Sequence, residues 1–236
     1  MKVSIIIPAH NEEEAIGLVI DEIPRDDVLE IIVVDNGSSD DTAGVAQRHG
    51  ARVVREERPG YGTACLAGLA AVDDGADVIV ILDGDHSDYP EDLPLLLAPI
   101  GEDKADFVIG SRTLGGAEKG SLLWNQRFGN ALACTLIRWL YGVRFTDMGP
   151  FRAVRRTSFE GLRMRDPDFG WNAEMQVKAI ENGLRIKEVP VRYRPRVGTS
   201  KISGTAKGTV LAGTRIIGTI LGRYPGYLRS RRGART

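Results

Sequence analysis

The sequence predicts an α/β fold with a mostly parallel sheet flanked by helices, and three observations support this prediction. Short apolar runs rich in β-branched residues alternate with helical patterns through the first 110 residues, as in parallel βαβ units. One of these runs, residues 76–83, contains the unbroken stretch VIVIL, which is typical of a strand buried on both faces. Acid-rich clusters follow the runs directly, at the edge of the sheet where α/β proteins bind ligands.

Seven strands are predicted in chain order, each at an apolar or alternating run. They cover residues 3–7, 29–35, 51–55, 76–83, 106–110, 151–155 and 185–193. Pro190 interrupts the last run, and because proline cannot donate to a neighbouring strand, this run is predicted at an edge of the sheet.

Helices are predicted between the strands, wherever apolar residues recur at the helical period. The predictions are a pattern from Asn11 through Ile20, residues 41–49, a pattern through Leu66, Leu69 and Val72, residues 122–141, residues 171–181, and a last helix from Ile202. Apolar residues of the last helix form a stripe about 140° wide, made of Ile202, Ala206, Val210, Ile216, Ile217, Ile220 and Leu221. Its glycines weaken the prediction, because glycine disfavours helix interiors.

Composition excludes several classes of protein. The chain has 236 residues, 42% hydrophobic and 27% charged, which argues for one globular domain and against disordered, collagen-like and coiled-coil proteins. No apolar run approaches the ~20 residues that span a bilayer, and no cationic leader precedes the first strand, so a cytoplasmic protein is expected. Cys65 and Cys134 stand in unrelated contexts and predict neither a disulfide framework nor a zinc site.

The net charge of −1 conceals a strong asymmetry between the two parts of the chain. Residues 1–150 carry 12 Lys and Arg against 26 Asp and Glu, whereas residues 151–236 carry 19 against 6. From Arg185 onward there are 13 basic residues and one acid, Glu188. This asymmetry predicts a metal or nucleotide site in the first part and an anionic partner for the second. The alternative is that like charges gather by chance on solvated faces.

Asp83 and Asp85 form the strongest local signal, because they follow the buried strand with only Gly84 between them. Two carboxylates on a turn at a strand end suit Mg²⁺ or Mn²⁺ that bridges to a diphosphate and neutralises it as it departs. Gly84 allows backbone and phosphate to approach closely. The alternative is a pair of solvated turn acids.

Two other strand ends carry polar motifs. Asp35 ends the second strand, where its carboxylate can accept hydrogen bonds from a base or ribose, although a helix N-cap is the alternative. Residues 8–13, PAHNEE, end the first strand. Residues 58–64 resemble a phosphate loop but match neither known glycine-rich fingerprint, so a tight packing turn is predicted there.

In order and spacing these motifs resemble the family 2 glycosyltransferases of GT-A fold, over about residues 3–205. The motifs are PAHNEE, VVDNGSSDDT, the Gly-x-Gly turn, LDGDHSDYPED and Gly110-Ser111-Arg112. Later motifs at 146–153, 171–175, 188–191 and 196–201 resemble the dolichyl-phosphate mannose synthase branch, which loads sugars onto polyprenyl phosphates.

The resemblance implies roles for individual residues. The donor nucleotide-sugar would be bound by Pro8, His10, Glu12, Asp35, Asn36, Asp83, Gly84, Asp85, Arg112, Arg196 and Lys201, with Asp83 and Asp85 as the ligands of Mg²⁺ or Mn²⁺. The acceptor phosphate would be bound by Arg112, Arg127, Asp147, Arg152 and Lys201. Asp85, Arg112 and Glu174, which matches a family acid near the acceptor, would be the catalytic residues. The alternatives are a surface acid for Glu174 and a structural ion pair for Arg152.

The sequence also departs from the family pattern. Ser87 stands where the family often has a glutamine, so the third metal ligand is open between Ser87, His86 and water. The segment from Asp147 to Arg152 is shorter than its family counterpart, which predicts a differently shaped acceptor loop. Neither the donor base nor the sugar follows from the resemblance.

A phosphate acceptor also agrees with the charges. A phosphate monoester has a second pKa near 6, so it is mostly ionised at neutral pH and requires cations more than a base. Arginines and lysines at 112, 127, 152, 196 and 201 supply such charge. A soluble hydroxyl acceptor, the main rival, would require a general base, for which Glu174 and Asp147 are the candidates.

The last helix and tail predict the partners. Cations flank the apolar stripe, and a cationic amphipathic helix can lie on an anionic membrane without spanning it. We therefore divide the chain into a GT-A domain, residues 1–205, and a basic amphipathic helix and tail, residues 206–236, attached peripherally to the cytoplasmic face of the membrane or to a membrane protein. Alternatively, the stripe packs on the core or on a second copy in a homodimer.

The resulting prediction is a metal-dependent inverting transferase that moves mannose or glucose from a GDP- or UDP-sugar to a dolichyl- or undecaprenyl-type phosphate. A non-catalytic module that binds nucleotides or nucleic acid through the basic tail ranks last, because the tail has few aromatic residues for base stacking. Nucleic acid is therefore not an expected partner.

Overall fold

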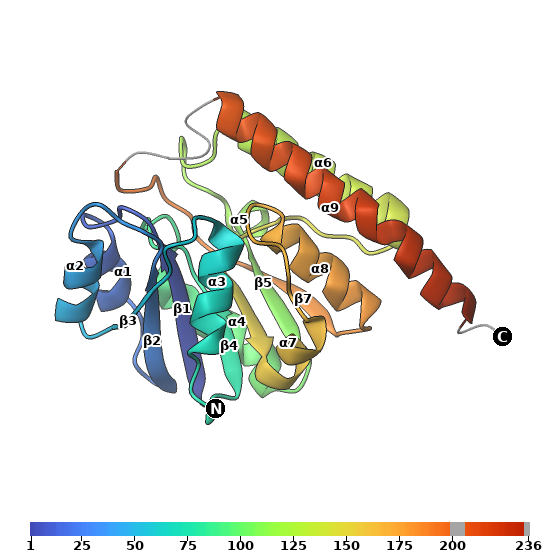
Figure 1. Cartoon of the computed structure of the whole chain (residues 1–236). Coiled ribbons are helices and arrows are strands. Elements are labelled where there is room, and N and C mark those ends of the chain that lie inside the picture. The colour runs from blue at the N-terminus through green and yellow to red at the C-terminus, as the bar shows by residue number, and fades with distance from the viewer. Residues whose placement is uncertain (199–205, 234–236) are drawn as a thin grey trace.

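A seven-stranded sheet in the order β3-β2-β1-β4-β6-β5-β7 forms the centre of the molecule in the computed structural model (Figure 1). The structure describes residues 1–198 and 206–233. The strands are β1 (Val3–Ala9), β2 (Val28–Asp35), β3 (Arg52–Arg55), β4 (Val78–Ile81), β5 (Phe107–Ser111), β6 (Arg152–Arg155) and β7 (Ile186–Pro190). All seven predicted strands are confirmed. β6 runs antiparallel to both of its neighbours, whereas the other pairings are parallel, so the mostly parallel sheet is confirmed as well.

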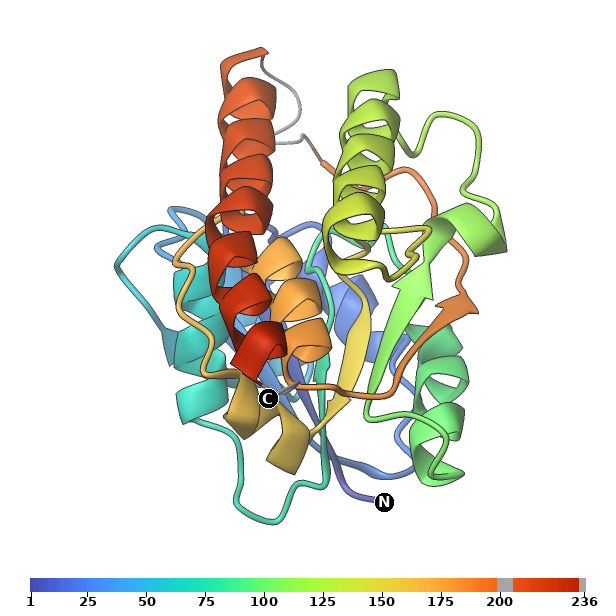
Figure 2. The same ribbon diagram turned by 90° about the vertical axis from the view of Figure 1, so that its right-hand side faces the viewer.

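Helices cover both faces of this sheet (Figures 1 and 2). They are α1 (Ile16–Asp21), α2 (Thr42–Arg48), α3 (Tyr61–Ala70), the 3₁₀ turn η1 (Pro90–Asp92), α4 (Leu93–Gly101), α5 (Arg112–Gly115), α6 (Trp124–Tyr141), α7 (Arg156–Leu162), α8 (Trp171–Glu181) and α9 (Ala206–Gly233). The sequence prediction missed α4, α5 and α7. α4 was obscured because its apolar residues run without a polar face and are interrupted by Pro94 and Pro99.

The core lies on both faces of the sheet, because successive strand residues point to opposite sides. Ile6 and Val34 pack with α3, α6, α8 and α9 on one face, while Ile5 and Val33 pack with α1 and α4 on the other. All four residues of β4 are buried, as predicted for a strand covered on both faces. Pro190 lies on the edge strand β7, which also confirms its predicted position.

α9 packs against α6 and α8 along its C-terminal part. Ile220 of the predicted stripe is fully buried, and the Tyr141 hydroxyl donates to its carbonyl oxygen at 2.8 Å. Val210 and Leu211 near the other end are 65% and 51% exposed. The N-terminal ends of α6 and α9 project together beyond the sheet (Figure 2). The stripe therefore packs on the core over one part only. No helix in residues 1–198 and 206–233 has the length and apolar character needed to cross a membrane.

Candidate active site

The carboxyl ends of β1, β2 and β4 meet at one edge of the sheet, and the predicted donor residues follow them. The Asn36 main-chain N–H donates to Ala9 O at 2.8 Å, which ties the end of β2 to the end of β1. The Asn36 amide donates to two carbonyls of segment 56–58 at 2.8 Å each and accepts from the Gly60 N–H at 2.9 Å. Asn36 thus fixes the wall of the site, while His10, on the β1 side, is exposed.

A cleft of about 410 Å³ opens beside Asp35, on the side of α2. Asp35 is 8% exposed and accepts a hydrogen bond from the Ser38 N–H at 2.9 Å, so its carboxylate is fixed at the cleft wall. The remaining lining includes Asp40, Gln47 and Glu56. Fixed acceptors of this kind suit the N–H and hydroxyl donors of a nucleoside.

Asp83 and Asp85 follow β4 directly and lie beside each other. The Tyr61 hydroxyl donates to Asp83 Oδ1 at 3.0 Å. Burial, together with the charge of Asp85, raises the pKa of Asp83 to about 7. Asp85 Oδ1 accepts from the Ser87 N–H at 2.9 Å, and Asp85 Oδ2 lies 3.2 Å from Arg196 Nη1. The edge therefore concentrates carboxylates, and among the described residues Arg112 and Arg196 are cations whose charge acts on Asp83.

The residues present fit a divalent cation. Within the described part of the chain, no three His, Cys, Asp or Glu side chains converge into a preformed metal cluster. Two carboxylates are what Mg²⁺ or Mn²⁺ takes from a protein when phosphate and water complete the shell. Of the predicted third ligands, His86 Nε2 already contacts Glu22 Oε1 at 3.0 Å, and Ser87 is buried at 2% exposure.

Asp88 is a functional candidate that the sequence prediction missed. Its side chain is 2% exposed, and among the residues that the structure describes neither carboxylate oxygen has a hydrogen-bond partner. Burial and the charges of Asp83 and Asp85 raise the pKa of Asp88 well above its usual value. The available signal was its place in the acid-rich stretch 83–92, which holds more carboxylates than turn formation requires. An unsatisfied buried carboxylate at this position is a group available to a substrate.

Segment 191–197, which follows β7, crosses this edge and carries three arginines. Arg192 pairs with Asp92 at 2.7 Å, Arg194 pairs with Glu22, and Arg196 pairs with Glu12 at 2.8 Å as well as with Asp85. The expectation that the late basic residues face an anionic partner is therefore wrong for Arg192 and Arg194. Their charge is balanced within the chain by acids of the first part.

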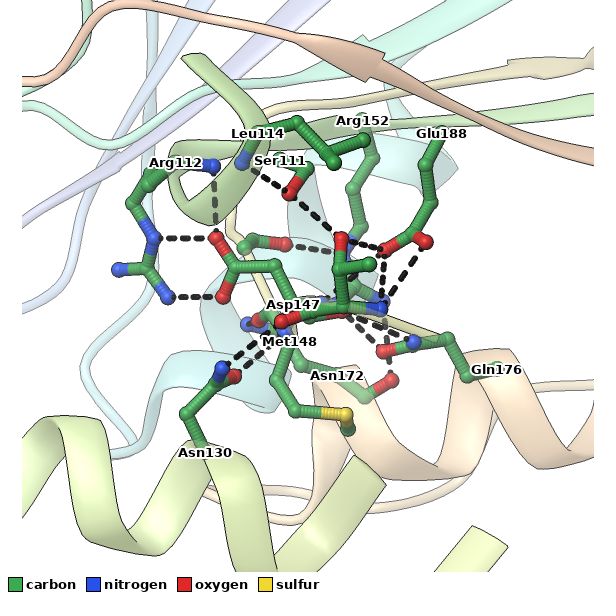
Figure 3. A network of polar contacts seen from close by, with 12 residues as sticks. Ser111, Arg112, Leu114, Asn130, Asp147, Met148, Arg152, Asn172, Gln176 and Glu188 are labelled. Carbon is green, nitrogen blue, oxygen red and sulfur yellow. Dashed lines mark hydrogen bonds and ion pairs between the residues drawn. The ribbon is translucent and has the colours of Figure 1, made fainter. Parts of the chain in front are cut away.

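Arg112 and Asp147 form the centre of a second polar network, which joins α5 to the loop before β6 (Figure 3). Asp147 Oδ2 accepts from the Arg112 main-chain N–H and Nε at 2.8 Å each, and Oδ1 accepts from Nη2 at 2.7 Å. The guanidinium also lies 5.1 Å from the centre of the Tyr193 ring. Asp147 is 1% exposed. It therefore acts as the counter-ion of Arg112, in a two-point geometry that fixes the cation.

The main chain of loop 146–149 is held by side chains from four elements (Figure 3). Glu188 of β7 accepts from the N–H groups of residues 146 and 147. Asn130 of α6 bonds the residue 146 carbonyl and the residue 148 N–H. Gln176 of α8 and Arg152 of β6 donate to carbonyls of residues 147 to 149. This network places the Asp147 carboxylate, and through it Arg112.

Arg152 does not reach the protein surface, where an acceptor would bind. It is fully buried and donates to Gly149 O at 2.7 Å, Asn172 O at 2.9 Å, Met148 O at 3.1 Å and Gln176 Oε1 at 3.0 Å. Burial lowers the pKa of its guanidinium to about 10. Of the two roles considered from the sequence, the structure has Arg152 in the structural one, through hydrogen bonds to carbonyls rather than an ion pair.

Glu174 is buried inside the protein rather than exposed on a helix surface. It is 4% exposed, accepts from the N–H groups of Arg165 and Asp166 at 3.0 and 2.7 Å, and pairs with Lys178 at 2.7 Å. Burial opposes its ionisation, yet these partners keep the pKa of Glu174 below its usual value. Glu174 thus fixes segment 165–167.

Segment 165–167 packs on the turn that precedes α3. The Thr63 N–H donates to Pro167 O at 2.9 Å, and a Cβ added to Gly60 or Gly62 would collide with this backbone. The prediction of a tight packing turn at residues 58–64 is therefore confirmed. The turn places Tyr61 against Asp83.

Two further predicted residues stand apart from these contacts. Arg127 is exposed on α6, where its Nε donates to Leu122 O at 3.4 Å. Lys201 lies outside the described residues. The structure thus brings Glu12, Asp85 and Arg196 into contact. It buries Arg152 and Glu174 away from the protein surface.

Comparison with known proteins identifies the class. The profile described as Glycosyl transferase family 2 matches residues 4–163. Glucosyl-3-phosphoglycerate synthase from Mycobacterium tuberculosis, solved with Mn²⁺, UDP-glucose and phosphoglyceric acid, superposes with a TM-score of 0.76 and 26% identity, covering 95% of this chain and 80% of that one. The chain belongs to glycosyl transferase family 2 and has the GT-A fold, so it is a glycosyltransferase of the hexosyltransferase class.

Curated relatives indicate the branch. A dolichyl-phosphate hexose transferase of Haloferax volcanii is 35% identical over 88% of this chain and 90% of its own length. An undecaprenyl-phosphate mannosyltransferase of Micrococcus luteus is 31% identical over 99% and 100%. A polyprenol monophosphomannose synthase of Mycolicibacterium smegmatis is 32% identical over 85% and 81%. The predicted similarity to polyprenyl-phosphate glycosyltransferases is confirmed.

Proposed function

We propose that the chain is a metal-dependent inverting hexosyltransferase that moves mannose or glucose from a GDP- or UDP-sugar to a polyprenyl phosphate. One observation carries the choice of acceptor: both general bases considered from the sequence are occupied. Asp147 is bound at two points by Arg112, and Glu174 is bound by Lys178 and two main-chain N–H groups. An acceptor that is already ionised at neutral pH requires no base.

On the donor side, the cleft beside Asp35 receives the nucleoside, with Pro8, His10 and Glu12 along the β1 end. Asp83 and Asp85 would hold Mg²⁺ or Mn²⁺, which supplies the positive charge that a departing diphosphate needs. Arg196 adds a cation beside Asp85.

On the acceptor side, Arg112 presents a fixed guanidinium, with Arg127 on the neighbouring helix. An acceptor phosphate oxygen attacks the anomeric carbon from the face opposite the diphosphate. The new C–O bond forms as the bond to the diphosphate oxygen breaks, so the configuration inverts and the nucleoside diphosphate leaves. Cations on both sides offset the repulsion between the two anions.

The relatives support this proposal because their names specify dolichyl, undecaprenyl and polyprenol acceptors or products. We propose a peripheral position at the cytoplasmic face of the membrane, where such a lipid is reached. Large apolar side chains on the projecting ends of α6 and α9 are exposed: Leu123 44%, Trp124 81%, Phe128 65%, Val210 65% and Leu211 51%. Within this proposal residues 1–205 perform the transfer, and residues 206–236 help to attach the enzyme to the membrane. The alternative is that the exposed apolar surface forms a homodimer.

Transfer of labelled sugar to lipid tests the proposal. GDP-mannose, GDP-glucose and UDP-glucose are offered with undecaprenyl phosphate in detergent, with Mg²⁺ or Mn²⁺ or with EDTA, and the label is followed into the organic phase. We expect one donor to label the lipid only with metal. Asp85→Ala should reduce turnover by at least about 1,000-fold, whereas Asp77→Ala, at the opposite edge of the sheet, should not. Label found only in water-soluble product would contradict the proposal.

A soluble hydroxyl acceptor is the second candidate, and Asp88 is the observation that favours it. Asp88 is a buried carboxylate with no hydrogen-bond partner, and the structural neighbour from Mycobacterium tuberculosis was solved with phosphoglyceric acid. Under this candidate Asp88→Asn removes a base and abolishes transfer to a hydroxyl acceptor. Under the lipid-phosphate proposal the same variant retains transfer to undecaprenyl phosphate within about tenfold.

A further inference from the structure

Arg196 bridges the two loops that carry the donor site. Its Nη2 lies 2.8 Å from Glu12 Oε1, after β1, and its Nη1 lies 3.2 Å from Asp85 Oδ2, after β4. Asp85 Oδ1 accepts a hydrogen bond from the Ser87 N–H, whereas Oδ2 faces the guanidinium. The guanidinium therefore contacts one of the two carboxylate oxygens through which Asp85 would bind a divalent cation.

Arg192, on the same segment, is a structural arginine whose hydrogen bonds can be compared with those of Arg196. Its main-chain N–H, Nε and Nη2 all donate to Asp92, at 2.8, 2.9 and 2.7 Å. It also lies 4.3 Å from the centre of the Tyr89 ring. Arg196 lacks this saturation, because its buried Nε has no hydrogen-bond partner in residues 1–198 and 206–233. The Arg196 guanidinium is thus bound by ion pairs with Glu12 and Asp85, and its Nε–H can donate to another acceptor.

The backbone allows this side chain to move alone. The Val197 N–H donates to Asp85 O at 3.0 Å and the Arg194 N–H donates to Ser87 O at 2.9 Å. These main-chain bonds hold segment 191–197 against the turn that carries the carboxylates, whatever partner the Arg196 side chain has. A diphosphate offers that side chain a matched alternative, since a guanidinium binds phosphate oxygens at two points.

We propose that Arg196 is the internal counter-ion of Asp85 in the substrate-free enzyme. Its guanidinium supplies the positive charge that a divalent cation would otherwise supply, so Arg196 must release Asp85 before metal binds. The inference rests on the proposed function, because it takes Asp85 as a metal ligand. A metal ion alone competes with Arg196. A metal ion that arrives with a diphosphate does not, because the diphosphate takes the guanidinium. Metal and diphosphate binding are thereby coupled, and the coupling is reciprocal.

Titration of the full chain with Mn²⁺ alone, with free Mn²⁺ followed by electron paramagnetic resonance, tests this inference. We expect Arg196→Gln to bind Mn²⁺ about tenfold more tightly than the wild type, because a competing charge is removed. Arg192→Gln is the matched control: it removes the same charge from the same segment and should change the affinity less than twofold. Arg196→Lys keeps the charge and should stay within about threefold of the wild type.

The outcomes separate the two proposals. If Arg196→Gln binds Mn²⁺ no more tightly than the wild type, or if Arg192→Gln has the same effect, the counter-ion inference is overturned while the metal site stands. If Asp85→Asn binds Mn²⁺ as well as the wild type, or if neither the wild type nor Arg196→Gln binds it, the metal site itself fails and the inference with it. Thermal unfolding of each variant confirms that it is folded, and Arg196→Met, which also removes the charge, carries the test should Arg196→Gln not fold.

Discussion

The proposed donor and acceptor sides of the site position their functional groups in different ways. On the donor side, Asp35 ends β2 and Asp83 follows β4, so each carboxylate is placed by the strand next to it. On the acceptor side, Arg112 is placed by Asp147, and Asp147 is placed by a loop that side chains of α6, β6, α8 and β7 hold. A carboxylate at a strand end is positioned by that strand, so substitutions of other nearby residues should disturb it little. A loop held by a network transmits the loss of any one member to the group at its end.

The largest expected effect comes from removing the buried cation of the acceptor network. Arg152→Met removes four hydrogen bonds to carbonyl and amide oxygens, three of them buried and the one to Asn172 O partly buried. Because breaking a buried charged network leaves its acceptors unsatisfied, we expect the free energy of unfolding to fall by about 3–5 kcal/mol. Chemical denaturation measures this loss.

Two controls sharpen the comparison. Arg48→Met removes an exposed ion pair with Asp41 and should cost less than about 1 kcal/mol. Asp83→Asn, on the donor side, should leave stability unchanged or raise it, because burial beside Asp85 already disfavours the charged carboxylate. A loss from Asp83→Asn as large as that from Arg152→Met would show that the two sides do not differ in this way.

The next effect is on catalysis. In Asp147→Asn the amide presents one acceptor oxygen where the carboxylate presents two, so Arg112 loses a charge-assisted hydrogen bond. A loss of about 2 kcal/mol corresponds to a roughly 30-fold lower kcat/KM. Steady-state transfer assays measure it, with Asp106→Asn, which removes one of the two ion-pair partners of Arg185 at the far edge of the sheet, as the control. Unchanged kcat/KM in folded Asp147→Asn would remove Arg112 from the proposed mechanism.

The smallest effect concerns the projecting end of α6. The double variant Trp124→Ser and Phe128→Ser removes two exposed aromatic side chains at the N-terminal end of α6. We expect about tenfold weaker binding to anionic lipid vesicles, because partial burial of each ring in the lipid interface is lost. Sedimentation with vesicles measures it. Transfer to a detergent-dispersed acceptor should persist, and a change in oligomeric state instead of vesicle binding would favour the homodimer.

Local sequence patterns predicted the strands of the proposed donor side but not the network around Asp147, and the reason is the distance along the chain over which the contacts act. The strands and the pair Asp83 and Asp85 follow from local patterns. The contact of Arg196 with Glu12 joins residues 184 positions apart, and no local pattern contains it. The burial of Arg152 was equally hidden, since an arginine in a short strand reads the same whether it faces a ligand or a set of carbonyls.

The direction of β6 decides where the acceptor loop lies. Because β6 is antiparallel to β4, its first residue, Arg152, sits beside Ile81, the last residue of β4. The chain therefore enters β6 at the edge where β4 leaves the sheet, and loop 146–149 arrives next to Asp83 and Asp85. A parallel strand of the same length would have delivered this loop to the opposite edge, roughly 13 Å away at ~3.3 Å per residue. One reversed strand thus brings the two halves of a bisubstrate reaction within reach of each other.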